Sequence, residues 1–372
     1  MRVGILVSSI GNFGQAGFYN AQEIGLAKAL DALCDEVKVY KLVTGDLPSR
    51  KEKIRGCSHA VVTFLPAKHF GINGIVDTSA LDGTLDAMIY FSDTQFSVPR
   101  VSRWARKNRV VLFPYIGVVE SHSTSRLKKS LIDRLFVRNL KVYKQCQCFA
   151  KTNEVKEKLK ALGVDKVTVT TVGLDEDLLQ QNCRRSSAET LKKKYGFAPE
   201  DKVLLFIGRL TEEKRPVEMI ELFADLVKKD DSFRLLMVGS GELSTAVTAA
   251  VARQGLKGMV FRIERIPNSE IWELYRMAAA FVNLNHQEIF GMAILEAMYY
   301  GCKVVAWNAP GPDCIIENGV SGWLVSSGEQ AVQKILDPAD LSKAAHNRVV
   351  SSFLWKTTAD KMMLYMRKNL NP

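Results

Sequence analysis

The segment from Glu288 to Glu296, with the sequence Glu-Ile-Phe-Gly-Met-Ala-Ile-Leu-Glu, constrains the fold of this chain more than any other feature. Its two carboxylates stand eight residues apart, so in one continuous helix they would diverge by about 80°. If the chain is a loop at Glu288 and turns helical near Gly291, the first acid lies over the helix N-terminus and the second lies inside the first turns. Free N–H groups at a helix start bind phosphate, and carboxylates accept hydrogen bonds from the hydroxyls of a sugar or ribose. An amphipathic helix with two solvated acids is the alternative.

The residues that follow favour a ligand site over a solvated helix. Residues 292–300 are nearly all apolar, so Glu296 is not expected to be a solvated acid. Gly301 suits a helix C-cap, residues 303–307 have the apolar composition of a buried strand, and residues 311–313 (Gly-Pro-Asp) indicate a turn. Helix, strand and turn in this order are typical of a doubly wound α/β domain. Such domains bind ligands at the carboxyl ends of their strands.

Length and composition indicate a protein of two globular domains. The chain has 372 residues, of which 47% are hydrophobic and 24% are charged, as in ordinary soluble proteins. No apolar run reaches the roughly 18 residues of a membrane span, and the N-terminus leads into a predicted strand without the features of a signal peptide. The seven cysteines are scattered, and Cys146 and Cys148 have too few partners for a zinc site. We therefore expect a cytoplasmic protein with reduced thiols.

Positive charge is concentrated in the N-terminal half of the chain. Residues 1–175 contain 26 Lys and Arg against 16 Asp and Glu, which gives a net charge of +10. Residues 176–372 contain 25 against 24, which gives +1. This asymmetry predicts an anionic surface or an anionic acceptor as the partner of the N-terminal half.

Strands alternate with helices through both halves, which predicts two largely parallel sheets. The first half contains a glycine-rich loop at residues 11–17 and a helix at 19–33, and the second half begins after a polar, basic connector at 182–194. The predicted strands are 3–8, 37–42, 60–65, 88–91, 110–113 and 167–172, then 203–208, 234–239, 259–263, 280–284 and 303–306; further helices are predicted at 216–228, 269–279 and 354–370. Two such halves imply a ligand bound in a cleft between them.

Two cations follow the first strand of the second half. Arg209 and Lys214 belong to the segment Gly-Arg-Leu-Thr-Glu-Glu-Lys, directly after an apolar strand. Both would reach the carboxyl edge of the sheet and could neutralise a diphosphate there, Arg with bidentate geometry and Lys as a point charge. A surface loop in which the two cations pair with Glu212 and Glu213 is the alternative, and the pattern alone does not decide between them.

Glycine-rich turns after two other strands are weaker signals. Gly239 and Gly241 follow the next strand of the second half, and Gly14 and Gly17 lie in the loop after the first strand of the chain. Glycine lets a ligand approach the backbone closely, but each of these turns is also compatible with a simple strand-to-helix connection.

Taken in order, these motifs resemble those of glycosyltransferase family 4. The chain carries Gly-Arg-Leu and Glu-Lys within residues 208–214, Gly-Ser-Gly at 239–241, the acidic segment at 288–298, and a Gly-Pro and a Gly-Trp-Leu-Val run within 311–325. Residues 173–175 resemble the linker signature of the family, and residues 353–355 resemble its closing helix motif. The resemblance spans nearly the whole chain and is strongest from residue 203 to residue 325.

The resemblance implies a GT-B architecture, which is α/β, with two Rossmann-like doubly wound domains facing across a cleft. The N-terminal, acceptor-binding domain is expected at residues 1–175, the nucleotide-sugar-binding domain at residues 176–352, and a C-terminal helix that packs back toward the N-terminal domain at residues 353–372. The implied activity is retaining transfer of a sugar from a nucleotide diphosphate, UDP by family frequency, without a metal or other cofactor.

The basic N-terminal half indicates a glycan or lipid-linked acceptor in cell-surface polysaccharide synthesis. Two alternatives remain open at this point. One is another nucleotide-sugar enzyme on the same fold, an epimerase or a phosphorylase, and the other is a non-catalytic partner subunit.

By the same resemblance, the expected catalytic residues are Arg209 and Lys214, which hold the diphosphate, Glu288, which receives hydroxyls of the donor sugar, and His122. Glu296 is expected to receive the ribose hydroxyls. His122 lies where the family often places an active-site histidine, and a surface histidine at a helix start is the alternative. The remaining expected donor contacts are Phe290, Gly291, Met292, Gly239, Gly241, Ile263, Gly14 and Gly17.

A basic amphipathic segment runs from residue 126 to residue 144. It holds seven cations and one acid, Asp133, with apolar residues between them. This pattern suits an anionic membrane surface, so the protein is expected to be peripheral on the cytoplasmic face of a membrane; a core-facing helix with a solvated basic face is the alternative. No aromatic stacking platform or motif indicates nucleic acid. The cations are Arg126, Lys128, Lys129, Arg134, Arg138, Lys141 and Lys144.

Overall fold

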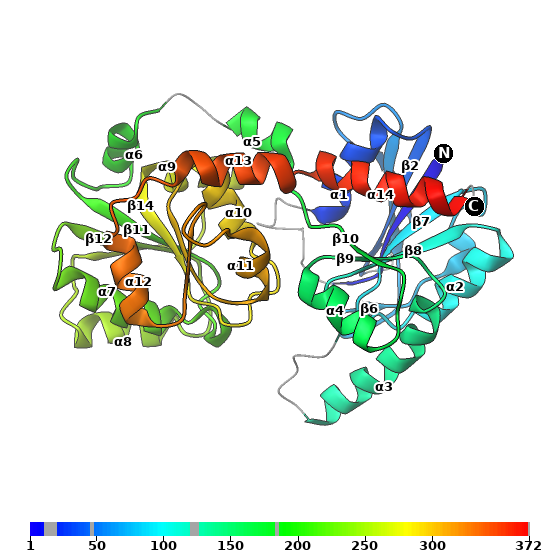
Figure 1. Ribbon diagram of the computed structural model, residues 1–372, viewed down its shortest axis with the longest axis horizontal. Coiled ribbons are helices and arrows are strands. Elements are labelled where there is room, and N and C mark those ends of the chain that lie inside the picture. The colour runs from blue at the N-terminus through cyan, green and yellow to red at the C-terminus, as the bar shows by residue number, and fades with distance from the viewer. Residues whose placement is uncertain (11–20, 45–47, 120–125, 183–185, 371–372) are drawn as a thin grey trace. The chain divides into compact units, whose positions relative to one another are not determined.

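The computed structural model describes residues 1–10, 21–44, 48–119, 126–182 and 186–370, and the chain divides into two compact units (Figure 1). The first unit comprises Met1–Asp175 together with Leu354–Pro372, and the second comprises Glu176–Phe353. The chain therefore leaves the first unit once and returns to it at its last helix.

An eight-stranded sheet forms the centre of the first unit. Its strands lie in the order β10-β9-β8-β7-β1-β2-β4-β3, and neighbours are parallel except for β3 and β4. The strands are β1 (Arg2–Val7), β2 (Glu36–Val43), β3 (Arg50–Lys53), β4 (Ala60–Pro66), β7 (Ala87–Phe91), β8 (Val111–Ile116), β9 (Cys148–Ala150) and β10 (Val167–Val169). The remaining elements are the hairpin strands β5 (His69–Phe70) and β6 (Asn73–Gly74), the 3-10 helix η1 (Thr78–Ala80), and the helices α1 (Gln22–Asp31), α2 (Val98–Lys107), α3 (Arg126–Tyr143), α4 (Asn153–Ala161) and α14 (Trp355–Leu370).

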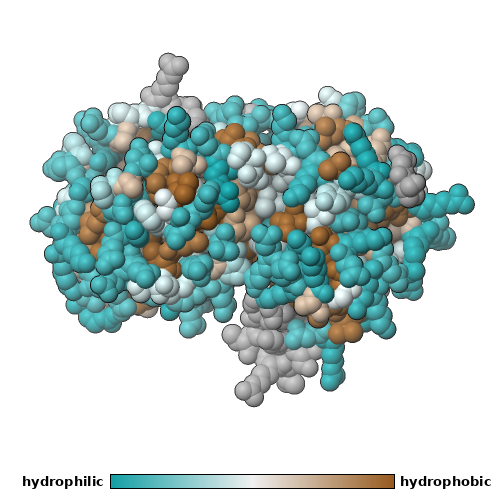
Figure 2. Space-filling model, viewed as in Figure 1, coloured by the Kyte–Doolittle hydropathy of each residue, from teal (hydrophilic) through white to brown (hydrophobic). Residues whose placement is uncertain are grey.

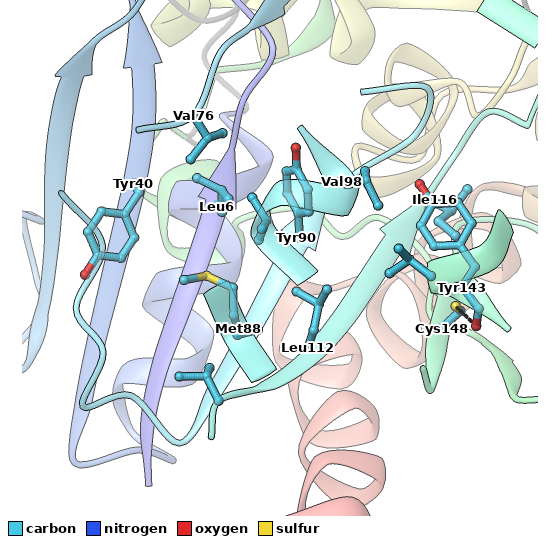
Figure 3. Close-up of a cluster of buried hydrophobic side chains, with 14 of the residues drawn as sticks. Leu6, Tyr40, Val76, Met88, Tyr90, Val98, Leu112, Ile116, Tyr143 and Cys148 are labelled. Atoms are coloured by element: carbon cyan, nitrogen blue, oxygen red, sulfur yellow. Dashed lines mark hydrogen bonds between the residues drawn. The ribbon is translucent and has the colours of Figure 1, made fainter. Parts of the chain in front are cut away.

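The core of the first unit follows from the apolar runs of its central strands. Five of the six residues of β1 are buried, as expected for a parallel strand covered on both faces. Leu6 of β1 and Tyr90 of β7 join one buried cluster with Val98 of α2 and Tyr143 of α3 (Figure 3). The Cys148 thiol donates to the Tyr143 carbonyl oxygen at 3.5 Å, so α3 is fixed against the edge strands of the sheet.

The second unit contains a six-stranded, wholly parallel sheet in the order β13-β12-β11-β14-β15-β16. Its strands are β11 (Lys202–Ile207), β12 (Phe233–Val238), β13 (Val260–Ile263), β14 (Ala278–Asn283), β15 (Val304–Trp307) and β16 (Trp323–Val325). Its helices are α5 (Glu176–Asn182), α6 (Ala188–Lys194), α7 (Pro216–Val227), α8 (Ser244–Arg253), α9 (Ile271–Met277), α10 (Met292–Tyr299), α11 (Pro310–Ile315), α12 (Gly328–Leu336) and α13 (Ser342–Ser352), with the 3-10 helices η2 (Glu212–Lys214) and η3 (Asn268–Glu270). The strand order reverses at β11, which places a ligand-binding switch point at the carboxyl ends of β11 and β14.

Three local predictions from the sequence are wrong. Residues 311–313 belong to helix α11 rather than to a turn, because Pro310 occupies the first helical position, where its missing N–H is tolerated. The connector expected at 182–194 contains α6, which is capped by the hydroxyl of Ser187 and buries Leu191. The helix expected at 269–279 ends at Met277, because the following residues pair with β11 as strand β14.

The surface and the cysteines agree with the composition. Hydrophilic residues predominate on the face shown in Figure 2, where hydrophobic residues form separate patches. Within the described ranges, no helix is long and apolar enough to cross a membrane. The six cysteines in the described part of the chain form no disulfide.

Helix α14 is fixed to the first unit at its first residue. The backbone N–H of Trp355 donates to the carbonyl oxygen of Leu174 at 3.1 Å, and Leu174 forms a β-bridge with Leu354. A Cβ atom at Gly25 would overlap the indole of Trp355, and a Cβ atom at Gly173 would overlap its backbone nitrogen. The motifs at 173–175 and 353–355 therefore form one junction, in which both glycines are required by close packing.

We expect Gly173→Ala to lower the free energy of unfolding by about 1–3 kcal/mol, because the added methyl group must displace the backbone at Trp355. Gly328→Ala is the matched control, since no atom lies within 4 Å of a Cβ at that position. Thermal unfolding followed by circular dichroism measures both variants. A Gly173→Ala protein that melts at the wild-type temperature would contradict the close packing.

Candidate functional site

The loops that follow β11 and β12 are packed backbone against backbone. Gly239 has a φ of +141°, and a Cβ atom there would overlap the carbonyl oxygen of Gly208. A Cβ atom at Gly241 would lie 2.5 Å from the carbonyl oxygen of Leu210, whose N–H donates to Ser240 O at 3.0 Å. The two glycines of the second loop are thus needed to hold the first loop in place. Ile263, at the end of β13, also contacts the second loop, because its carbonyl oxygen accepts a hydrogen bond from Gly239 N at 2.9 Å.

The two cations of the first loop have different partners. Arg209, whose side chain is 65% exposed, forms an ion pair with Glu213. Lys214 is only 23% exposed and donates from Nζ to Glu288 Oε2 at 2.7 Å. The alternative of a loop whose cations pair with its own acids therefore describes Arg209 but not Lys214. Lys214 instead connects the β11 loop to the segment that leads into α10.

Glu288 is held in a loop by three donors on one oxygen. Its Oε2 accepts from Lys214, from Asn283 Nδ2 at 3.2 Å and from Asn285 Nδ2 at 3.3 Å. The same asparagines fold the loop, because Asn283 Oδ1 accepts from Asn285 N and Asn285 Oδ1 accepts from Gln287 N, both at 2.9 Å. The sequence prediction missed both asparagines, although two polar side chains at the end of an otherwise apolar strand are a usable signal.

Helix α10 begins directly after this loop, as the spacing of the two acids predicts. Gly291 occupies the N-cap position with a φ of +103°, which disfavours residues that carry a Cβ. Phe290 is 7% exposed, so its ring is packed inside the protein. Gly311 packs against the Phe290 carbonyl and donates from N to Glu288 O at 2.9 Å. Met292, the first residue of the helix, is half-buried.

Glu296 is buried inside α10 and is not a solvated acid. It is 4% exposed, and one carboxylate oxygen accepts from the hydroxyl of Tyr275 at 3.0 Å. Burial, and then the charge of Glu296, raise the pKa of Tyr275 well above its ordinary value, so the tyrosine stays protonated and keeps donating. Tyr275 also stacks on Tyr300 with ring centroids 6.1 Å apart. The sequence prediction missed Tyr275, which comes from a different helix, α9.

A second contact runs parallel to the Lys214–Glu288 ion pair. Arg215, which has a φ of +55°, places Nη1 2.6 Å from Nδ1 of His286. The His286 ring stacks on Trp307 with centroids 3.7 Å apart. Burial, and then the charge of Arg215, lower the pKa of His286, so the ring is neutral near pH 7. Lys214 and Arg215, two consecutive residues of the loop after β11, thus contact Glu288 and His286 in the loop between β14 and α10.

Several predicted residues lie wholly or partly outside the described structure. His122, Gly14 and Gly17 fall in segments that the structure does not describe. For Arg126, Lys128 and Lys129 only the helical backbone of α3 is described. The four remaining cations of that helix, Arg134, Arg138, Lys141 and Lys144, are exposed.

The described part of α3 uses its apolar face for the core. Phe136, Asn139 and Tyr143 are each at most 5% exposed. The Asn139 side chain donates to the Gln95 carbonyl oxygen at 2.9 Å. In this part of the helix the structure therefore has the arrangement of the alternative, a core-facing helix with a solvated basic face.

The prediction that no metal is needed overlooks one acidic motif. Asp175-Glu176-Asp177 has the Asp-x-Asp spacing of some metal sites. Here Asp175 forms an ion pair with Lys28 at 2.5 Å. No group of three or more His, Cys, Asp or Glu suited to a metal occurs among the described residues.

Residues 187–348 match the protein family described as "Glycosyl transferases group 1". They form a group 1 glycosyltransferase domain. This domain contains Arg209, Lys214, Glu288 and Glu296 together with the residues that hold them, so the whole described site belongs to it.

The chain is also similar to curated proteins over part of its length. It is 28% identical over 225 residues to D-inositol 3-phosphate glycosyltransferase 2 of Catenulispora acidiphila, and this alignment covers 55% of this chain and 52% of that protein. It is 29% identical over 153 residues to N-acetyl-alpha-D-glucosaminyl L-malate synthase of Bacillus anthracis, which covers 40% and 39%. The chain thus aligns with about half the length, or less, of the curated relatives it matches.

The fold extends over the whole chain. The structure resembles that of Anabaena HepE in complex with UDP and glucose with a TM-score of 0.71 at 16% sequence identity, covering 99% of both chains. Together with the two largely parallel sheets, this likeness identifies the fold as GT-B, built from two Rossmann-like domains.

Proposed function

We propose that this chain is a retaining glycosyltransferase of family 4 that moves a sugar from a nucleotide diphosphate, UDP, to a glycan or lipid-linked acceptor in cell-surface polysaccharide synthesis. The observation that carries the proposal is the Lys214–Glu288 ion pair near the start of α10. It places a cation that can bind a diphosphate beside a carboxylate that can accept hydrogen bonds from sugar hydroxyls. Arg209 lies in the same loop as Lys214 and remains two-thirds exposed.

The chemistry divides between the cations and the acids. In the transfer step the bond between the anomeric carbon and the diphosphate oxygen breaks, and the diphosphate leaves with the electron pair. Arg209, Lys214 and the N-terminus of α10 stabilise that growing negative charge. Among the residues that the structure describes, we assign no carboxylate as a covalent nucleophile, because Glu288 is better suited to bind the hydroxyls of the donor sugar. In a front-face substitution, the acceptor hydroxyl attacks from the side of the leaving group and passes its proton to the departing diphosphate.

Glu288 is suited to hold the donor sugar. Its three bonds from protein donors converge on Oε2, and no described residue donates to Oε1. Oε1 can therefore accept a sugar hydroxyl while Lys214 and the two asparagines fix the carboxylate. When a diphosphate enters, Lys214 can contact it and Glu288 at once, because an ammonium group has three donors.

Donor and acceptor classes have separate support. HepE, which shares the fold, binds UDP and glucose, and this favours UDP. The two curated relatives are named for acceptors that carry a phosphate or a carboxylate. The N-terminal half of this chain, with its net charge of +10, suits an anionic acceptor of that kind.

The direct test is a panel of nucleotide sugars incubated with the protein, with and without candidate acceptors. We expect release of a nucleoside diphosphate from one donor and retention of configuration in the product, measured by NMR. An epimerase would convert the donor without releasing diphosphate, and a phosphorylase would require phosphate and form a sugar 1-phosphate. A non-catalytic subunit would bind nucleotide and release nothing.

We expect EDTA to change the transfer rate by less than about twofold, because Arg209 and Lys214 supply the charge that a metal would supply. Rates are measured in EDTA and after addition of excess Mg²⁺ or Mn²⁺. A strict requirement for either ion would contradict this assignment, and Asp175→Asn, Asp177→Asn and their combination would then identify the acidic motif as the site.

We also propose that the N-terminal unit is peripheral on the cytoplasmic face of a membrane and contacts anionic lipid through α3. Each cation near an anionic surface contributes about 1 kcal/mol, so reversing Arg134, Arg138 and Lys141 to Glu should release the protein from anionic vesicles in sedimentation assays. Reversing Lys51, Lys53 and Arg55, which are exposed near the β3 edge, makes the same change in charge elsewhere and is the control. Equal loss of vesicle binding in both variants would show that binding depends on the net charge of the protein and not on α3.

A further inference from the structure

The short hairpin β5–β6 of the first unit exposes large apolar side chains. Phe70 is 67% exposed, Ile72 is 53% exposed and Ile75 is 48% exposed, and all three lie within six residues. Three neighbouring side chains of this size in water are unfavourable for a protein that gains nothing from them. The sequence analysis did not single out this segment.

The hairpin is connected to the first unit along β6 and at its turn. Gly74 N donates to Ser8 O at 2.8 Å, and Ile10 N donates to Ile72 O at 2.7 Å. Val76, the residue after the hairpin, is fully buried, and its side chain lies beside Leu6 in Figure 3. The exposed side chains are therefore presented by an ordered element.

The turn at the tip is built to project Ile72. Gly71 has a φ of +57° and is the first of two residues between the paired strands, whereas Ile72 has no left-handed φ. This is the pattern of a type II′ turn, in which glycine takes the first central position. Ile72 takes the second central position, and it is 53% exposed although its carbonyl oxygen accepts from Ile10 N.

The sequence around the hairpin is free of acids, and the hairpin contacts a loop that also contacts α3. The 24 residues between Glu52 and Asp77 contain no Asp or Glu, and Lys68 at the start of the hairpin is exposed. The Phe70 ring lies 6.2 Å from the ring of Phe96. The loop of Phe96 also accepts the hydrogen bond from Asn139 of α3 at Gln95. The hairpin and helix α3 therefore contact the same loop.

We propose that the hairpin at residues 68–75 is a membrane-inserting element, which places Phe70, Ile72 and Ile75 among the lipids of an anionic bilayer while the cations of α3 contact the headgroups. This inference rests on the proposed membrane contact and adds an apolar component to it. The positive charge favours an anionic lipid surface over another apolar protein surface, because Lys68 at the start of the hairpin is exposed and α3, which contacts the same loop, carries exposed cations.

The test is vesicle sedimentation with the full chain and the double variant Phe70→Ser/Ile72→Ser. Removal of two large apolar contacts should weaken binding to anionic vesicles at least about tenfold, and the loss should persist at high salt, where the α3 contribution is screened. The control is Leu162→Ser/Leu364→Ser, which removes two other exposed apolar side chains of the first unit, 42% and 52% exposed. Calorimetry with UDP verifies that both variants keep their nucleotide site.

A gain-of-function variant excludes misfolding as the explanation. Ile72→Trp should bind more tightly, and brominated lipids should quench the added fluorescence. Unchanged vesicle binding in the hairpin variant, while wild type binds and the α3 reversal does not, would overturn the hairpin proposal and leave the α3 contact standing. Wild type that ignores anionic vesicles would overturn both. Unchanged vesicle binding together with a loss of transfer to the acceptor would instead assign the hairpin to acceptor binding.

Discussion

Replacing Arg209 and Lys214 together by alanine should lower the turnover for transfer by about 10⁴-fold or more while the protein remains folded. Removal of one preorganised donor from a developing negative charge costs about 10²–10³ in rate, and here two donors are removed from the same leaving group. Both cations act on charge that grows as the diphosphate departs, so kcat should fall more than the Michaelis constant rises. Single-turnover release of nucleoside diphosphate measures the effect.

The chain offers a matched control for this variant. Lys228→Ala/Arg253→Ala removes one lysine and one arginine of the same unit, which pair with Asp225 at 2.8 Å and with Glu221 at 3.7 Å. We expect this control to retain nearly full activity. The loss of Lys214 also removes a partner of Glu288, so thermal unfolding is measured on both variants. A folded Arg209→Ala/Lys214→Ala protein with wild-type turnover would refute the assignment of the diphosphate site.

The sequence predicted the acidic segment and the strands of the second sheet because their signals are local. The break between Glu288 and α10 depends on one glycine, and Gly291 has the left-handed φ that the break requires. The strands β11 to β15 are nearly continuous apolar runs, which a parallel sheet covered on both faces imposes. Such features depend on neighbours within a few residues, so they can be predicted without knowing the fold.

The partners of the site residues could not be predicted, because they come from distant elements. The Lys214–Glu288 ion pair joins residues 74 positions apart, and the Tyr275–Glu296 hydrogen bond joins two helices. For the same reason, the sequence alone could not decide whether Arg209 and Lys214 bind a ligand or pair with the acids of their own loop. Strand β3 gave no apolar signal, since its four residues are exposed and charged and it is held by antiparallel backbone pairing with β4.

The two acids differ in burial, and this difference suggests separate roles. Glu296 is deeply buried and accepts a hydrogen bond from Tyr275. Glu288 lies at the opening of α10 with its side chain 14% exposed. Under the proposed function, Glu296 should act on the nucleoside, and Glu288 should act on the reacting sugar.

Glu296→Gln should therefore weaken UDP binding by roughly tenfold or more, whereas Glu288→Gln should leave UDP affinity within about threefold and lower kcat by about 10–100-fold. These factors correspond to the 1.5–3 kcal/mol of a hydrogen bond to a charged group. Calorimetry with free UDP and steady-state transfer rates separate the two effects. Tyr275→Phe is the structural control, because it removes the donor to Glu296 but leaves the carboxylate; it should lower stability and affect UDP affinity less than Glu296→Gln. Equal losses of UDP affinity in Glu288→Gln and Glu296→Gln would show that the two acids do not divide the donor between them.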